Sequence, residues 1–448
     1  MISQDRQQTV ERVTKAVEGT ALPWLVVHGA RKVDARGMQD DFWLIARDGV
    51  ITATGSGEMS LASAARGFGI TAEEVRNDAR DKGYDDAAGN GRDAVSTLSF
   101  KSGVVVFDAQ GKNLTPGYID IHAHGSWDRS FDDGLEGIDI ARAGHLVHGT
   151  TRQVLSLITN PMDVMCANLK NVKAAMGKRT DVLGAHLEGP FLALSRKGAH
   201  DPKCLKDPTD DLVDRLLDAA DGSIRQITIA PELPHGISAI KRFAAAGVVP
   251  AVGHCDADYE TAKRGFEAGS RIMTHIFNAM NGLKHREPGP IPAAVEDPRV
   301  TIELINDGFH VQNPVLKMAV KFAPHRIAFV TDAMSATDCP DGAYKLGALD
   351  VAVKDGHARL VSNGSIAGST LLLERSVERA VNVLGMAPSD AVEAATLTPA
   401  RAFGFDRVNA VTGAPLGLLS PGYAADVLIS DPETWQVEHV WCGGRQVR

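Results

Sequence analysis

Histidine and carboxylate residues in this sequence repeatedly follow short apolar runs. The set comprises His122, His124, Glu188, His254, His275, His310 and Asp332. One residue separates His122 from His124, and side chains two apart on a strand point to the same side, so both imidazoles can bind one cation. Imidazole nitrogens combined with a carboxylate oxygen suit zinc, or iron, manganese or cobalt in its place. The pattern therefore predicts a divalent metal site with one or two ions.

The remaining members of the set suggest how such a site would react. His254 and His275 can supply further nitrogen ligands and Glu188 an oxygen ligand. Asp332 is the remaining carboxylate of the set. A carboxylate beside a metal can take a proton from activated water and return it to a leaving group. Taken singly, each residue has an ordinary structural explanation; Asp332, for example, could cap a helix that opens at TDA. Because several such residues each close an apolar run, we expect them to share one site.

The apolar runs belong to a rhythm that covers most of the chain. From residue 114 onward, β-like segments such as RQVLSLI, IRQITIAPE and GVVPAVGH alternate with helical stretches. This alternation is typical of βα units around a parallel sheet, and about eight units fit before residue 400. In a closed barrel the carboxyl ends of the strands meet on one face, where active sites form. The predicted fold class is therefore α/β, with a TIM (β/α)8 barrel over residues 114–405.

Both ends of the chain predict strands outside this barrel. Three short apolar runs precede residue 55, and GYAADVLIS and VEHVWCGGRQV come after the barrel. We expect a small β-sandwich domain built from both chain ends, with residues 1–113 as its first part and 406–448 completing it. The segment of about 57–100 is rich in Ala, Gly, Asp and Arg and predicts an inserted helix with a polar loop. Residues 4–19 predict an amphipathic helix.

Composition and charge narrow the classes of partner. The net charge is -9 over 448 residues, without a Lys/Arg run, so nucleic acid is not expected as a partner. Five scattered cysteines without a CxxC pair indicate reduced thiols in a cytoplasmic compartment. No segment reaches the roughly 18 to 20 apolar residues of a membrane span, and the N-terminus has no apolar signal region. We therefore expect a cytoplasmic protein with no membrane partner.

With these residues placed, the sequence resembles the N-acetylglucosamine-6-phosphate deacetylases of the amidohydrolase superfamily. TPGYIDIHAHG is similar to the opening metal motif of the superfamily, and HLEGPF, GAHDP, GHCDADYE, THIFNAMNGL, REPGP, DGFHV, VTDAM and IAGST follow in the family's order. The resemblance covers roughly residues 114–448, whereas the segment of about 57–100 departs from the family's compact β-domain. It implies that metal-activated water hydrolyses the acetamide of N-acetylglucosamine 6-phosphate, giving glucosamine 6-phosphate and acetate.

The resemblance also implies roles for single residues. Asp332 matches the catalytic acid/base, and His200 matches a residue that polarises the acetamide carbonyl. The matching metal ligands are Glu188, His254 and His275, together with His122 and His124, a pair that some members keep and others replace. The residues that match substrate-binding groups are Ala199, His200, Asn278, Ala279, Arg286, His310, Ile366, Ala367 and Gly368. In this family Arg286 would reach across from a neighbouring subunit, which implies a homodimer.

Three alternatives stay open at this point. Arg286 taken alone could form a surface ion pair with Glu287 or Glu303. Another amidohydrolase, acting on a cyclic amide, would often carry a lysine at the position of Glu188, where HLEGP has glutamate. A non-catalytic interaction protein on the same fold should have lost ligands that this sequence keeps.

Overall fold

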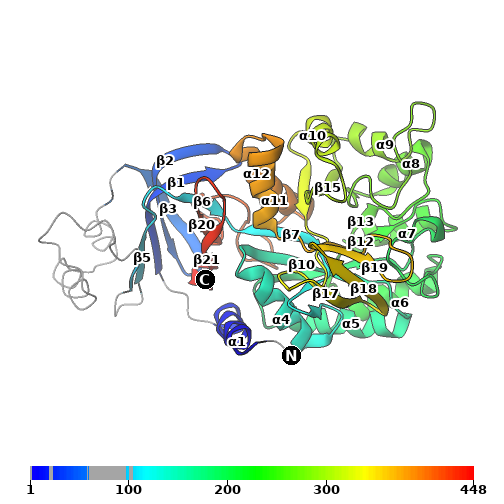
Figure 1. Cartoon of the computed structure of the whole chain (residues 1–448), viewed down its shortest axis with the longest axis horizontal. Helices are drawn as coiled ribbons and strands as arrows, with labels where there is room; N and C mark the ends of the chain where they lie inside the picture. The colour runs from blue at the N-terminus through cyan, green and yellow to red at the C-terminus, as the bar shows by residue number, and fades with distance from the viewer. Residues whose placement is uncertain (1–2, 20–23, 58, 60–96, 100–103) are drawn as a thin grey trace, which may run out of the picture.

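The larger sheet of the molecule is a parallel barrel. A computed structural model describes residues 3–19, 24–57, 59, 97–99 and 104–448. Eight strands run in the order β16-β15-β14-β13-β12-β11-β10-β7, and β16 contacts β7, so the sheet is nearly closed (Figure 1). The strands are β7 (Tyr118–Ala123), β10 (Thr150–Ile158), β11 (Val182–Glu188), β12 (Ile224–Ile229), β13 (Val249–Val252), β14 (Ile272–Met273), β15 (Thr301–Ile305) and β16 (Ile327–Val330). The predicted barrel is confirmed.

Helices connect the strands and cover the outside of the barrel. They are α4 (Gly134–Leu146), α5 (Met162–Met176), α6 (Asp210–Ala220), α7 (Gly236–Ala245), α8 (Tyr259–Ala268), α9 (Ile291–Glu296), α10 (Asn313–Phe322), α11 (Leu373–Arg379), α12 (Pro388–Ala395) and α13 (Leu397–Ala402). Each amphipathic helix buries one face; α6, for example, buries Val213, Leu216 and Ala220. The strands lie between these helices and the barrel interior, which is why they are apolar along most of their length.

A second sheet joins the two ends of the chain. Its main path is β22-β21-β20-β6-β1-β2-β3, and β5 pairs with both β1 and β4. The N-terminal strands are β1 (Trp24–Asp34), β2 (Gly37–Arg47), β3 (Val50–Ser56), β4 (Thr97–Ser99), β5 (Val104–Asp108) and β6 (Asn113–Pro116), and the C-terminal ones are β20 (Val427–Ser430), β21 (Val437–Cys442) and β22 (Arg445–Gln446). Apart from residues 57, 59 and β4, the helix and loop expected at about 57–100 lie outside the described residues.

The N-terminal helix α1 (Gln4–Glu18) lies against the barrel rather than within the second sheet. It contacts α4, and its apolar face buries Val10, Val13 and Val17. The guanidinium of Arg179 donates to the Thr14 hydroxyl over 3.2 Å, which ties the helix to the loop before β11. The predicted amphipathic helix is thus present, and its buried stripe explains its formation.

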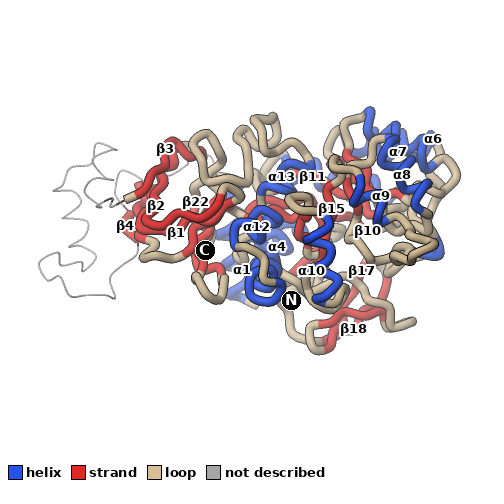
Figure 2. Tube along the Cα trace, turned by 90° about the horizontal axis from the view of Figure 1, so that it is seen from above, coloured by secondary structure: helices blue, strands red, loops and turns tan. Residues whose placement is uncertain are grey.

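A small antiparallel sheet interrupts the βα rhythm after β16. It consists of β17 (Gly342–Leu346), β18 (Leu349–Lys354) and β19 (His357–Leu360), and β17 and β18 stand out from the barrel in Figure 2. The chain returns from it through residues 366–369, where Ala333 and Ser369 form a parallel bridge. This return brings the loop expected to line a substrate against the end of β16. No helix in the described part of the chain is long and apolar enough to span a bilayer.

Candidate metal centre

Glu188 is the centre of a buried cluster at the carboxyl ends of the barrel strands. It is the last residue of β11, and imidazoles approach both of its carboxylate oxygens. Oε1 lies 3.0 Å from Nε2 of His254, 3.2 Å from Nε2 of His275 and 3.3 Å from Nε2 of His122, whereas Oε2 lies 3.1 Å from Nε2 of His124 and 3.2 Å from Nε2 of His200. Burial disfavours charge on Glu188, but the imidazoles outweigh it and hold the pKa of this carboxyl well below its usual range.

Two groups of donor atoms share Glu188. His122, His124 and Glu188 form one compact triplet, and Glu188, His254 and His275 form the other; within each triplet the ligand atoms lie within 4.8 Å of one another. All five side chains are buried. Nitrogen and carboxylate ligands in this number suit one or two divalent cations.

The hydrogen bonds of His254 show that the cluster fits a cation. Its Nδ1 lies 2.8 Å from the carbonyl oxygen of Arg196, which can only accept, so Nδ1 carries the hydrogen. In the neutral ring Nε2 then presents a lone pair to Oε1 of Glu188 at 3.0 Å and to Nε2 of His275 at 3.0 Å. Lone pairs that face one another at this distance repel, and a bound cation would turn the same contacts into coordination.

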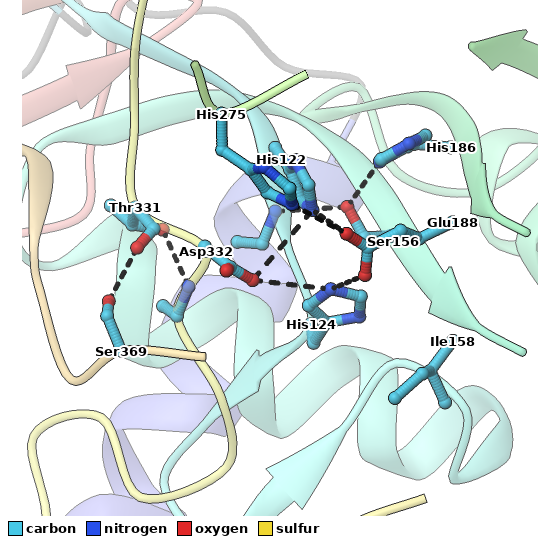
Figure 3. Close-up of polar contacts among 12 residues, drawn as sticks. His122, His124, Ser156, Ile158, His186, Glu188, His275, Thr331, Asp332 and Ser369 are labelled. Atoms are coloured by element: carbon cyan, nitrogen blue, oxygen red, sulfur yellow. Dashed lines mark hydrogen bonds and ion pairs between the residues drawn. The ribbon is translucent and has the colours of Figure 1, made fainter. Parts of the chain in front are cut away.

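Asp332 lies at the edge of the cluster, two residues beyond β16. Its Oδ1 is 3.5 Å from Nε2 of His124 and 3.8 Å from Nε2 of His122, and Figure 3 shows His124 between Asp332 and Glu188. The backbone of Asp332 has a φ of 49°, and it is fixed on both sides, because its N–H donates to the carbonyl of His122 and its carbonyl accepts from Ser369. No helix starts here, so the alternative of a helix cap does not apply.

Gly368 allows the loop of residues 366–369 to lie directly against Asp332. Its φ is 64°, and a Cβ atom there would meet the carbonyl oxygen of Asp332 at 2.9 Å and Cβ of Met334 at 3.3 Å. Ala367 next to it donates its N–H to the carbonyl of Ala358 in β19. The Ile366–Gly368 segment is therefore held between Asp332 and the small antiparallel sheet.

His200 and His310 occupy different positions around this centre. His200 is buried, its Nδ1 has no hydrogen-bond partner within the described residues, and burial lowers its pKa to about 4 despite the nearby carboxylate of Glu188. It is therefore neutral near pH 7. Burial also disfavours charge on His310, but a 2.6 Å hydrogen bond from Nδ1 to the Asp307 carboxylate raises its pKa above the usual value.

Arg286 lies apart from the cluster, on an exposed loop. Residues 282–287 are all exposed, and they follow the turn at Phe277–Ala279, in which Phe277 and Ala279 have positive φ angles and Asn278 hydrogen-bonds to the carbonyl of His275. Neither expected ion pair of Arg286 forms, because Glu287 pairs with Lys284 and Glu303 is buried against His122. The structure thus brings the predicted metal ligands together with Asp332 and His200, but leaves Arg286 outside that group.

Three further polar residues of the site went unpredicted. His186, two residues before Glu188, bonds to Ser156 and Thr228 through its two ring nitrogens, each over 2.9 Å. Asp120 accepts from the backbone N–H of His122, and Glu303 contacts the His122 ring. The signal for all three was available: each is a polar residue inside a buried apolar strand, which demands a partner.

This arrangement has a counterpart in known proteins. The profile of the amidohydrolase family matches residues 113–447, three quarters of the chain and the whole of the barrel. The chain belongs to the amidohydrolase family.

Individual relatives narrow the comparison within that family. An N-acetylgalactosamine-6-phosphate deacetylase of Escherichia coli O157:H7 is 33% identical over 346 residues, covering 76% of this chain and 89% of the relative. An N-acetylglucosamine-6-phosphate deacetylase of Vibrio furnissii is also 33% identical, covering 75% of this chain and 83% of the relative. These relatives are hydrolases, and the chain is an enzyme of the same class.

A solved structure shows the same fold over nearly the whole chain. The N-acetyl-D-glucosamine-6-phosphate deacetylase of Mycobacterium smegmatis, solved as a mutant in complex with N-acetyl-D-glucosamine-6-phosphate, superposes with a TM-score of 0.78 at 30% identity. The match covers 95% of this chain and 99% of that protein. The likeness therefore includes the second sheet as well as the barrel.

Proposed function

We propose that this chain hydrolyses the acetamide of N-acetylglucosamine 6-phosphate, releasing glucosamine 6-phosphate and acetate. The observation that carries the proposal is the cluster in which five imidazoles surround Glu188 beside the carboxylate of Asp332. The deacetylase relatives and the solved complex support this choice of substrate. Of the two functional alternatives raised by the sequence, a non-catalytic protein would have no use for so many buried ligands, and the two deacetylase relatives are named for N-acetylhexosamine 6-phosphates rather than a cyclic amide.

The residues divide into those that hold metal and those that move protons. Glu188, His254 and His275 would hold one ion, and His122 and His124 with Glu188 a second. Zinc is the expected metal, with iron, manganese or cobalt as alternatives. A divalent metal bound there supplies Lewis-acid activation of water and of the amide carbonyl.

Asp332 and His200 would act directly on the reacting groups. Asp332 would take a proton from the attacking water and deliver it to the amide nitrogen as the C–N bond breaks, so that the amine leaves neutral. His200, neutral near pH 7, keeps one ring N–H that can donate to the carbonyl oxygen as negative charge develops on it. Without proton delivery the amine would have to leave as an anion, which makes Asp332 the more demanding of the two roles.

The sugar and its phosphate would be bound by groups around the cluster. Ala199, Asn278, Ala279 and the Ile366–Gly368 segment are the lining residues of the proposal, and His310 provides a ring whose positive charge the Asp307 carboxylate favours. A phosphate requires positive charge and several donors, which His310 and an arginine offer together. In the proposal the arginine is Arg286 of a second subunit.

A homodimer is the form in which Arg286 would complete the site. Beside the loop of Arg286, an apolar cavity of about 290 Å³ is lined by Leu283, Met318 and Phe322, which are 51%, 45% and 46% exposed. Apolar side chains this exposed next to an unpaired arginine support burial against a second copy. Light scattering on the purified protein measures the mass directly. The cytoplasmic location expected from the sequence stays a prediction, which cell fractionation tests.

The 4-epimer of the sugar is a second candidate substrate. It is favoured by the N-acetylgalactosamine-6-phosphate relative, which is as similar as the N-acetylglucosamine-6-phosphate one. Acetate release should be measured with both N-acetylhexosamine 6-phosphates, with both unphosphorylated sugars and with a cyclic amide, and metal content should be determined on the same sample. Turnover of the phosphorylated sugars alone supports the proposal. Turnover of the cyclic amide alone, or a metal-free active enzyme, would refute it.

A further inference from the structure

A buried glutamate, Glu303, lies next to the proposed metal centre. Its identified side-chain contacts do not include Glu188 or Asp332, the carboxylates of that centre. Glu303 is in β15, between the apolar residues Ile302 and Leu304, and it has no exposed surface. Placing a carboxylate inside a barrel is costly unless donors surround it. The hydrogen-bond partners of Glu303 should therefore show what role its charge has in the site.

Every identified partner of Glu303 is a hydrogen-bond donor. Oε1 accepts from the side-chain amide of Gln226 over 2.6 Å. Oε2 accepts from the backbone N–H of His275 over 3.2 Å and lies 3.0 Å from Nδ1 of His122. Because a carboxylate surrounded in this way has no hydrogen to give, Nδ1 of His122 must carry the hydrogen in that contact.

This hydrogen bond decides which nitrogen of His122 is left for a metal. With the hydrogen on Nδ1, the neutral ring has its lone pair on Nε2, which has no hydrogen-bond partner within the described residues. Nε2 points to Oε1 of Glu188 at 3.3 Å and to Oδ1 of Asp332 at 3.8 Å, both of them acceptors. Acceptors around this nitrogen are satisfied by a proton on Nε2 or by a metal ion between them, and metal binding displaces that proton.

His186 and His124, the imidazoles next to His122, have no carboxylate among the described residues behind the ring that selects a nitrogen for metal binding. His186 uses both nitrogens on Ser156 and Thr228 and has no lone pair to offer a metal. His124 has no partner for Nδ1 within the described part of the chain, so no hydrogen bond at that nitrogen selects Nε2 for a metal. His122 is therefore the ligand on which a second ion at this side depends.

We propose that Glu303 is a positioning residue that commits His122 to bind metal through Nε2, and that the second ion of the proposed function depends on it. The proposal rests on the proposed function only in assuming a metalloenzyme. This second cation position is distinct from the one formed by Glu188, His254 and His275. At that first position the carbonyl of Arg196 accepts from Nδ1 of His254 and so leaves Nε2 for the metal.

The test is a metal titration that needs no substrate. Metal-free wild type and Glu303→Leu are titrated with Co²⁺, and the bound equivalents are followed by the visible spectrum and by elemental analysis. Wild type should bind two equivalents. Glu303→Leu should bind the first as wild type does and the second about 10- to 100-fold more weakly, the usual effect of removing a partner behind a metal ligand.

Three further variants separate positioning from a general structural effect. Glu303→Gln keeps an acceptor for His122 if the Gln226 amide turns over, so it should restore most of the second affinity. Asp120→Asn alters a buried carboxylate that accepts from the backbone N–H of His122 and from the Thr331 hydroxyl, not from the His122 ring, and it should keep both equivalents. In a His122→Ala background, Glu303→Leu should cause no additional loss, because its route to the metal has been removed.

Several results would overturn the proposal. They are a single equivalent in wild type, an unchanged isotherm in Glu303→Leu, or a loss that persists in the His122→Ala background. Circular dichroism and the retained first equivalent report folding of each variant. Two equivalents that respond to Glu303 while no sugar releases acetate would refute the proposed substrate and leave this inference intact.

Discussion

The cluster around Glu188 and the loop of residues 282–287 differ in how firmly the fold fixes their side chains. The four histidine ligands of the cluster, His122, His124, His254 and His275, lie at or just beyond the ends of barrel strands, are buried and contact a carboxylate oxygen. Residues 282–287 are exposed, and Arg286 has no ion pair among the described residues. One region is thus complete within a single chain, whereas the other presents a charged group without a partner.

The difference separates two kinds of functional residue. A buried polar cluster must be satisfied inside the chain, because an unpaired charge there costs several kcal/mol, on the order of the whole stability of a domain. An exposed arginine costs nothing when it is unpaired, so its position within one chain says little about its use. Changes in the first region should therefore remove metal or chemistry, and changes in the second should alter recognition only.

The largest effect is expected from Glu188→Gln. This change removes the charge that all the surrounding imidazoles share, so both metal equivalents and activity should fall to background. Elemental analysis of the purified variant, with acetate release on the same sample, measures both. Glu393→Gln is the matched control, because Glu393 is also a buried glutamate but pairs with His325 and Arg401, away from the cluster. Full metal content in Glu188→Gln would show that Glu188 is not a ligand.

Asp332→Asn should separate chemistry from metal binding. The amide keeps the size of the side chain but cannot carry the proton, so kcat should fall about 10²- to 10⁴-fold with metal content unchanged. Steady-state kinetics on metal-loaded enzyme gives the result. Asp338→Asn, in the same loop but bonded to Trp127, serves as a control and should keep kcat within a few-fold. Near-normal turnover by Asp332→Asn would eliminate it as the acid/base.

Arg286→Ala tests the exposed region. Loss of a charge-assisted hydrogen bond to phosphate costs roughly 1.5 to 3 kcal/mol, so kcat/KM for the phosphorylated sugar should fall about 10- to 150-fold. Turnover of the unphosphorylated sugar should hardly change. The neighbouring Lys284→Ala is the control, because Lys284 already pairs with Glu287. Equal losses on both sugars would mean that Arg286 does not read the phosphate.

Mixing two inactive variants determines which subunit Arg286 serves. If it acts across a dimer, a mixed dimer of Arg286→Ala and Asp332→Asn contains one site with both residues intact and one with neither. Random pairing makes half of the dimers mixed, so about a quarter of normal activity should return after subunit exchange. If exchange is verified by a mass tag and no activity returns, Arg286 serves its own barrel.

The same contrast explains what the sequence could predict. The barrel and the places of His122, Glu188 and Asp332 follow from apolar runs that end in polar residues, because parallel strands bring their carboxyl ends to one face. The local sequence offers Glu303 only as a possible ion-pair partner of Arg286, whereas a charge within TIELI signals a buried acceptor. Contacts such as that between Glu303 and His122 join residues 181 apart in sequence, and no local pattern encodes them.

A third charged region allows stability to be separated from metal binding. His148 lies 3.5 Å from the Asp338 carboxylate and hydrogen-bonds to Glu374, which also accepts from the backbone of Val437. Burial disfavours its charge, but the carboxylates of Asp338 and Glu374 outweigh this and raise the pKa of His148 to about 9. The group links the loop after Asp332 to α11 and the C-terminal strands without any metal ligand.

The smallest expected effect follows from that raised pKa. A histidine whose pKa is 6.5 in the unfolded chain and about 9 in the folded one stabilises the fold fully below about pH 6.5 and loses this contribution as the pH rises through about 9. His148→Asn should therefore lower the Tm by about 1 to 3 °C at pH 6, and the difference from wild type should shrink at pH 9.5. Since wild type and variant share the metal centre, the pH dependence of metal binding cancels in the comparison. His325→Asn is the control: His325 also pairs with a glutamate, but its side chain is 66% exposed, so solvent screening should leave a smaller difference at pH 6. A His148 difference that is constant from pH 6 to 9.5 would mean that its packing, not its charge, holds the loop, and the electrostatic link to the loop after Asp332 would have to be abandoned.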